Sequence, residues 1–293
     1  MRPLPARPSA PVALAVALAA LAALGGCTRQ PTAGLPPGTT VDDLPDSESW
    51  DASLRTSADG RPTLAIDASY LARYTRDSAY VYLGPAPDAE TAEPVRVRVF
   101  DAEGRPRATV TAGEAWVYDD GARLLAQGDV RTVVAGDDGA TLQADRMTLE
   151  DGAVAAEGEV RASVRASVRA GDGAQVEAAR LRYEPDGSFA ASGGTVVHLT
   201  GSTQATVLAR RVSGTAGGGR LEATGDARVQ ASGGRTLQAG RVVWSRAAGR
   251  FRAPGAFSFV GPGERVRGRG LSATADLSRY SFRDITGEIE VRE

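Results

Sequence analysis

Histidine and cysteine each occur once in the 293 residues, methionine occurs twice, and asparagine and lysine do not occur. A lone cysteine excludes an intrachain disulfide, and a lone histidine removes most metal sites and catalytic triads. Without Asn-Gly turns, hairpins must rely on Asp-Gly, Gly-Gly and Pro. These absences argue against an enzyme, and we expect no cofactor and no metal.

Strong charge of either sign is also missing. The 34 basic residues, all arginine, nearly balance 36 acidic ones, which gives a formal net charge of −2. This balance argues against nucleic-acid binding. The chain is 42% hydrophobic and long enough to bury one large core or two ordinary ones, which argues against disorder throughout.

The first 27 residues are typical of a secretory signal. Arg2 and Arg7 precede an apolar run over residues 12–24, which is too short for a bilayer core of roughly 30 Å. The run ends in Leu24-Gly25-Gly26-Cys27, which resembles a bacterial lipobox. We therefore expect acylation of Cys27 and a stable membrane anchor. The alternative is an ordinary secreted chain with an incidental thiol.

Residues 28–49 are rich in Pro and Gly and show no apolar periodicity, which predicts a semi-extended tether. From residue 50 to residue 293 apolar residues alternate with polar ones, and turn residues interrupt them every eight to twelve positions. The clearest case is the alternation of Val or Ala with Arg or Ser over residues 160–170, typical of a half-buried antiparallel strand. We interpret its arginine stripe as a solvated face rather than a binding patch.

In addition to this alternation, a longer sequence pattern repeats about every thirty residues. Similar phrases, with apolar or small residues at offsets 0, 2, 5 and 7, begin at Val110, Leu142, Val176, Val207, Leu237 and Val266. A glycine marker follows each phrase, at Gly128, Gly158, Gly193, Gly225, Gly255 and Gly287.

The offsets of the phrase predict a corner. Offsets 0 and 2 are even whereas 5 and 7 are odd, so a strand keeps one face buried only if it bulges or bends between them. Such corners let each strand pass from one sheet to another. The sequence therefore predicts an all-β fold, an elongated antiparallel β-jelly roll with two stacked sheets. A parallel β-helix is the competing architecture, and repeated Asp-Gly turn signals favour antiparallel hairpins.

Several short segments, in their order and spacing, carry a family resemblance. They include Ser49-Trp50-Asp51, the Gly-Arg-Pro turns at Gly60 and Gly104, the run 108–115, Gln127-Gly128-Asp129-Val130, the run 237–244 and the run 268–273. Together they resemble the LptC and LptA (OstA-like) proteins of periplasmic lipopolysaccharide transport, and the lipobox favours an LptC-type lipoprotein. The chain departs from the family in having more repeats than a usual LptC and a lipobox in place of a transmembrane helix.

The resemblance implies a role in lipopolysaccharide export. A protein of this kind receives lipopolysaccharide from an inner-membrane ABC transporter and passes it along an apolar β-trough to an LptA-like periplasmic bridge. Its partners attach by strand addition at exposed sheet edges. We expect a periplasmic lipoprotein anchored through Cys27, with the inner membrane favoured by the resemblance and the outer membrane left open.

Inward-facing positions of the strand pattern are the candidate trough lining. These are Leu142, Leu149, Val160, Ala162, Val164, Ala166, Val168, Tyr183 and Trp244. Val and Ala dominate, so facing sheets have room for acyl chains, although the same residues also suit an ordinary sandwich core.

The alternative function is a structural or adhesive surface lipoprotein with a filled core and no lipid transport. Enzymatic interpretations are weak. His198 lies in a strand pattern without a neighbouring nucleophile. A polysaccharide hydrolase that uses two distant carboxylates needs no local motif, so this alternative stays open.

Overall fold

The structure is a computed structural model. It describes residues 44–75, 79–86, 93–118, 123–135, 140–150, 152–165, 173–200, 204–215, 219–285 and 290–291. The chain divides into two compact units, residues 1–126 and residues 127–293, with the boundary inside strand β7 (Arg123–Val134).

The described part of the first unit is a set of antiparallel strands. They are β1 (Ser47–Ala58), β2 (Arg61–Tyr74), β3 (Tyr80–Gly84), β4 (Val95–Phe100), β5 (Pro106–Ala112) and β6 (Glu114–Tyr118). The long strand β2 pairs with β1 on one side, and on the other side with β4 near its start and β3 near its end. β4 pairs with β5, and β3 with β6. The bend at Gly113 separates β5 from β6, where the sequence predicts the first corner.

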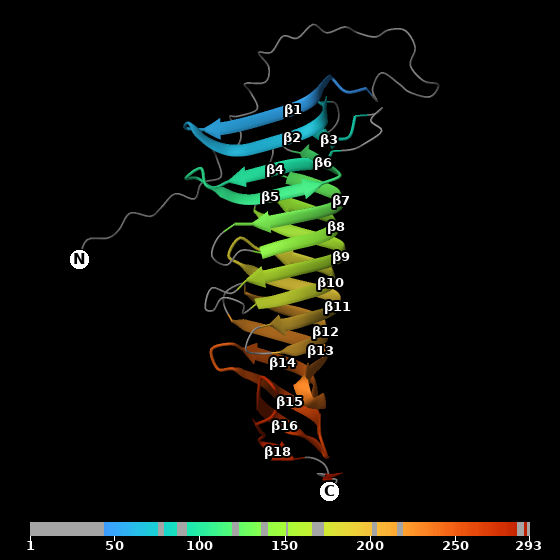
Figure 1. Cartoon of the computed structure of the whole chain (residues 1–293), viewed down its shortest axis with the longest axis vertical. Coiled ribbons are helices and arrows are strands. Elements are labelled where there is room, and N and C mark those ends of the chain that lie inside the picture. Colours follow the sequence, from blue (N-terminus) through green and yellow to red (C-terminus); the bar gives the residue numbers. More distant parts are fainter. Residues whose placement is uncertain are drawn as a thin grey trace, which may run out of the picture. The chain divides into compact units, whose positions relative to one another are not determined.

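The second unit is a ladder in which each strand pairs with the next. It continues from β7 through β8 (Ala140–Glu150), β9 (Ala153–Arg165), β10 (Gly173–Tyr183), β11 (Ser188–Thr200), β12 (Ala205–Thr215), β13 (Arg220–Ala231), β14 (Thr236–Ser245), β15 (Arg250–Gly261) and β16 (Glu264–Thr274). From β8 to β16 each neighbouring pair is antiparallel, and Figure 1 shows these strands following one another in chain order. A single 3-10 turn (Ser232–Gly234) joins β13 to β14. Three two-residue strands, β17 (Tyr280–Ser281), β18 (Asp284–Ile285) and β19 (Glu290–Val291), pair with β16.

Every pairing from β8 to β16 has a register shift near its middle, and these shifts coincide with the repeated phrases. On β14, Leu237 and Ala239 are buried before the shift, and Val242 and Trp244 after it. Burial therefore changes parity inside a single strand, which requires a bulge or corner. The predicted all-β, antiparallel jelly-roll class is confirmed, and the parallel β-helix is excluded for the described strands.

The glycine markers lie in these corners. Gly158, Gly193 and Gly225 have positive φ and fall at the register shifts of β9, β11 and β13. Gly255 falls at the shift of β15, and Gly287 lies outside the described residues. At Gly193 an added Cβ would lie 2.6 Å from the Cβ of Ala179 on β10. Glycine therefore lets the bulged strand approach its neighbour closely.

Candidate functional site

The candidate site in the second unit is the apolar space enclosed by the two halves of the bent strands. Val207 and Val212 of β12, on either side of a bulge, line the same cavity. The rest of its lining comes from β11, β13, β14 and β15: Val197, Leu221, Ala223, Val242, Trp244 and Phe251. Each bent strand thus turns apolar side chains from both halves toward one interior.

This cavity is narrow. Its volume is about 10 Å³, roughly the space that one water molecule needs. The rings of Trp244 and Phe251 both line it, with their centroids 4.6 Å apart. A cavity of this volume has no room for an acyl chain.

The interior offers almost no polar chemistry. Among the described residues only Thr132 and Thr195 are buried and polar. The Thr132 hydroxyl lies 3.1 Å from the sulfur of Met147, and the hydroxyl of Thr195 has no hydrogen-bond partner. No group of three or more His, Cys, Asp or Glu able to hold a metal occurs in the described part of the chain. Such an interior suits apolar groups.

His198 lies on β11 and is half-buried. Its Nδ1 lies 3.2 Å from the hydroxyl of Thr206, its cross-strand partner on β12. The imidazole is therefore hydrogen-bonded to a hydroxyl on the neighbouring strand.

The predicted trough residues fall into three groups. Those with buried side chains are Leu142, Val160, Ala162, Tyr183 and Trp244. Leu149 is half-buried. Of Val164 only the backbone is described, and it pairs with Ala140 and Ala174. Ala166 and Val168 lie outside the described residues. The predicted acylation site Cys27 also lies outside them.

Cross-strand pairing brings some of the buried residues together. Leu142 of β8 is opposite Ala162 of β9, and Val160 of β9 is opposite Ala178 of β10. Trp244 lies on β14, several strands further along the ladder, and belongs to the cavity described above. The predicted lining is therefore spread along the interior of the second unit and does not form one local pocket.

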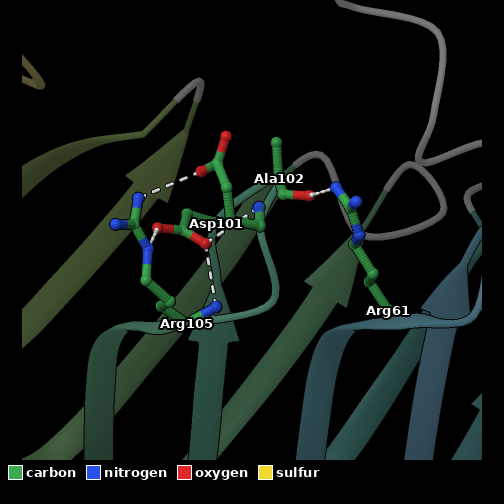
Figure 2. A network of polar contacts seen from close by, with 5 residues as sticks. Arg61, Asp101, Ala102 and Arg105 are labelled. Atoms are coloured by element: carbon green, nitrogen blue, oxygen red, sulfur yellow. Dashed lines mark hydrogen bonds and ion pairs between the residues drawn. The ribbon is translucent and has the colours of Figure 1, made fainter.

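The two Gly-Arg-Pro turns of the first unit lie against each other. At Gly104 an added Cβ would lie 3.2 Å from the Cδ of Pro62, and Arg61 donates from Nη1 to the carbonyl of Ala102 at 3.0 Å. Figure 2 shows this bond beside the turn that Asp101 closes by accepting hydrogen bonds from the backbone and side chain of Arg105. These bonds lower the pKa of Asp101. The repeated motif thus fixes two hairpins to each other.

The first unit also carries an aromatic face that the sequence analysis missed. Cross-strand pairing across β1, β2, β3 and β6 places the rings of Trp50, Tyr70, Tyr82 and Trp116 in a row, with successive centroids 5.7, 6.3 and 5.5 Å apart. Beside this row Tyr74 stacks on Tyr80, which lies next to Tyr118. Trp50 is 61% exposed. The signal was in the composition, since five of seven tyrosines and two of three tryptophans lie between residues 50 and 118.

Two carboxylates accept hydrogen bonds from this face. The Tyr70 hydroxyl donates to Glu48, and the Tyr82 hydroxyl donates to Oε2 of Glu114 at 3.2 Å. Burial, and then the neighbouring carboxylate, raises the pKa of Tyr70, and the same causes raise the pKa of Tyr82 to about 12. Both phenols therefore stay neutral at physiological pH and act as donors.

Comparison of the sequence with protein-family models gives no match, and comparison with the sequences of curated proteins gives none either. Within the described residues, no helix has the length and apolarity needed to cross a bilayer.

Proposed function

We propose that the protein is a membrane-anchored periplasmic component of lipopolysaccharide export. In this function an inner-membrane ABC transporter delivers lipopolysaccharide, the apolar interior of the bent strands holds its acyl chains, and an LptA-like periplasmic bridge receives it. The sequence resemblance motivates the choice of lipid. No enzymatic step is part of the proposal.

The observation that best supports this proposal is that the buried positions switch from one face to the other within a single strand. From β8 to β16 buried apolar side chains lie on both sides of the register shifts, and those of β12 line one cavity, which gives the second unit an apolar layer between strand halves. Only two polar side chains are buried among the described residues. Burying each methylene of an acyl chain in such a layer contributes about 0.8 kcal/mol.

The edges of the sheets support docking by strand addition. Among the described residues β1 pairs only with β2, so one edge of a twelve-residue strand has no paired neighbour. Edges of this kind accept extended segments of other proteins through main-chain hydrogen bonds.

Site-specific photocrosslinking in cells tests lipid binding. A photoreactive phenylalanine analogue replaces Trp244, which lines the cavity, and in a matched variant it replaces Gln238, which is exposed on the same strand. We expect lipopolysaccharide adducts from position 244 and few from position 238. Equal labelling at the two positions would sink the proposal.

The narrow cavity favours a second candidate, a structural or adhesive surface lipoprotein with a filled core. A volume of about 10 Å³ is what an ordinary sandwich core leaves. Depletion of the protein separates the two functions. Export predicts lipopolysaccharide stalled at the inner membrane, whereas a structural role predicts unchanged lipid in the outer membrane.

The anchor has its own test. Cys27→Ser removes the thiol that we expect to be acylated, so metabolic labelling with a fatty acid and retention in the membrane fraction should both be lost. Ser47→Cys in the same background supplies a thiol outside the lipobox as a control and should restore neither. Membrane retention of Cys27→Ser would contradict anchoring through this residue.

A further inference from the structure

The last full strand of the ladder, β16, is covered unequally on its two edges. Its pairing with β15 extends from Gly261–Glu264 to Arg250–Thr274. On the other edge the described residues form three two-residue strands, β17, β18 and β19. Between β17 and β18 the backbone N–H of Arg283 donates to the carbonyl of Arg269 at 3.0 Å. We call residues 275–285 the strap. It runs antiparallel to β16 from Thr274 and covers the edge of β16 through the short strands β17 and β18 (Figure 1, red).

The strap also closes the end of the apolar interior. The ring of Tyr280 lies 4.6 Å from that of Phe259, and the ring of Phe282 lies 6.3 Å from that of Phe257. Phe257 and Phe259 are inward-facing residues of β15 and are 5% and 0% exposed. Leu277 of the strap is itself fully buried. Removing the strap therefore uncovers both a strand edge and the apolar residues behind it.

Two glycines of β16 allow the strap to approach this strand closely. A Cβ added to Gly268 would lie 2.2 Å from the carbonyl oxygen of Asp284, and one added to Gly270 would lie 3.0 Å from the Cβ of Arg283. Tyr280 fixes the strap from the other end by donating to Oε2 of Glu264 at 2.6 Å. The Cβ added to Gly268 would also lie 3.2 Å from the ring of Phe257, the β15 partner of Gly268, so alanine at position 268 displaces the strap backbone more than it displaces β15.

We propose that the strap is an exchangeable gate, and that an extended partner strand with acidic side chains displaces it to pair with β16. Charge identifies the partner. Arg265, Arg267 and Arg269 alternate on the exposed face of β16, and the strap already places Asp284 opposite Arg269. Opposite charges across neighbouring strands stabilise pairing, and like charges destabilise it.

The inference rests on the proposed function in one respect, that the uncovered interior receives lipid. When a partner strand displaces the strap and pairs with β16, the rings of Tyr280 and Phe282 move away and the end of the interior opens. Docking and opening then occur in a single step, so the apolar surface is not exposed to water without a partner.

Two variants of the full chain, both with Cys27→Ser, set the state of the strap. Gly268→Ala opens it. Ser272→Cys with Ser281→Cys, which are cross-strand partners, locks it when oxidised and frees it when reduced. The single variant Ser281→Cys is the control for the lock.

Hydrogen exchange measures the opening. We expect residues 275–285 to exchange about tenfold faster in Gly268→Ala than in the parent, with β8–β15 unchanged, and slower in the oxidised lock. Equal exchange in all three proteins would overturn the gate.

Binding of labelled peptides measures the partner. A short fluorescent peptide alternating Val and Glu should bind Gly268→Ala about tenfold tighter than its Val and Lys counterpart, and neither should bind the oxidised lock. Equal affinity for the two peptides overturns the acidic partner. Self-association of Gly268→Ala without peptide binding, seen by ultracentrifugation, makes a second copy the occupant and also overturns it.

Fluorescent lipopolysaccharide separates the gate from the proposed function. We expect uptake to fall in the order opened, parent, locked, with reduction of the lock restoring the parent rate. Equal uptake in all three despite different exchange overturns the coupling of the strap to lipid. No uptake by any of them, with exchange and peptide binding as expected, overturns the proposed function and leaves the strand gate established.

Discussion

Val207 and Val212 lie five residues apart on strand β12, and their side chains line the same cavity. On a regular strand an odd separation places side chains on opposite faces. Here the bulge between them reverses the parity, so the two halves of the strand enclose one interior. The same relation recurs on the other phrases and gives the second unit its apolar layer.

The first prediction concerns the packing of this layer. Phe251 is fully buried against Trp244 and lines the cavity. Phe251→Ala should lower the free energy of unfolding of the second unit by about 3–5 kcal/mol, because it removes the ring and leaves its volume empty. Urea unfolding followed by Trp244 fluorescence, in a background with Trp50→Phe and Trp116→Phe, measures the loss. Arg252→Ala, on the exposed face of the same strand, should change it by less than about 0.5 kcal/mol.

The second prediction concerns the corners. Gly193 has φ +91°, and a Cβ there would lie 2.6 Å from the Cβ of Ala179, so Gly193→Ala should destabilise the second unit by about 1–3 kcal/mol. Gly255 is the matched control, because it occupies the equivalent marker without a positive φ and with no atom within 4 Å of an added Cβ. Gly255→Ala should be neutral. If Gly193→Ala left the thermal unfolding midpoint as unchanged as Gly255→Ala, the corner would not need glycine.

The corners were predictable from sequence because their signal is local. A single phrase such as Leu237, Ala239, Val242 and Trp244 contains the change of parity, and the glycine marker follows along the same chain. The aromatic face was missed because its register is not local. Trp50, Tyr70, Tyr82 and Trp116 come from four strands, and only the pairing of β1, β2, β3 and β6 brings them into one row.

The width of the cavity could not be predicted from the sequence either. Alternating Val and Ala identify which residues face inward, but the distance between facing strand halves decides whether they touch. The strap is a similar case, because the close approach of Asp284 to Gly268 is visible only in three dimensions.

The third prediction is an alkaline loss of stability in the first unit. Burial, and then Glu114, raises the pKa of Tyr82 from 10.0 to about 12. Between these values the unfolded chain releases the proton and the folded one retains it, so stability that is complete below pH 10 is lost as the pH rises toward 12. Tyr82→Phe should flatten this part of the curve.

A Trp244→Phe background isolates the measurement, because the remaining fluorescence comes from Trp50 and Trp116 of the first unit. Tyr280→Phe is the control. Burial, and then Glu264, raises the pKa of Tyr280 to about 12 as well, but this residue belongs to the second unit. An unchanged slope in Tyr82→Phe would show that this phenol does not contribute to the alkaline loss.

The last prediction is that acid loosens the turn between β16 and the strap. Hydrogen bonds from Ser278 and Thr274 hold the pKa of Asp276 at about 2, below its usual 3.8. The Thr274 hydroxyl also accepts from the backbone N–H of Arg279, so the carboxylate holds together a turn of six residues. Because the folded-state pKa is lowered, the stabilisation is complete above pH 3.8 and is lost as the pH falls toward 2. Hydrogen exchange of residues 275–285, corrected for the intrinsic rate, should therefore speed up over this interval.

Asp276→Ala should raise the exchange of the strap at neutral pH and remove most of its acid dependence, since the titrating group is gone. Asp186→Ala provides the matched control, because the pKa of Asp186 is lowered in the same way by Ser188 in the β10–β11 hairpin. That variant should loosen its own hairpin and leave the strap unchanged. If Asp276→Ala retained the full acid response, the turn carboxylate would not be what holds the strap to β16.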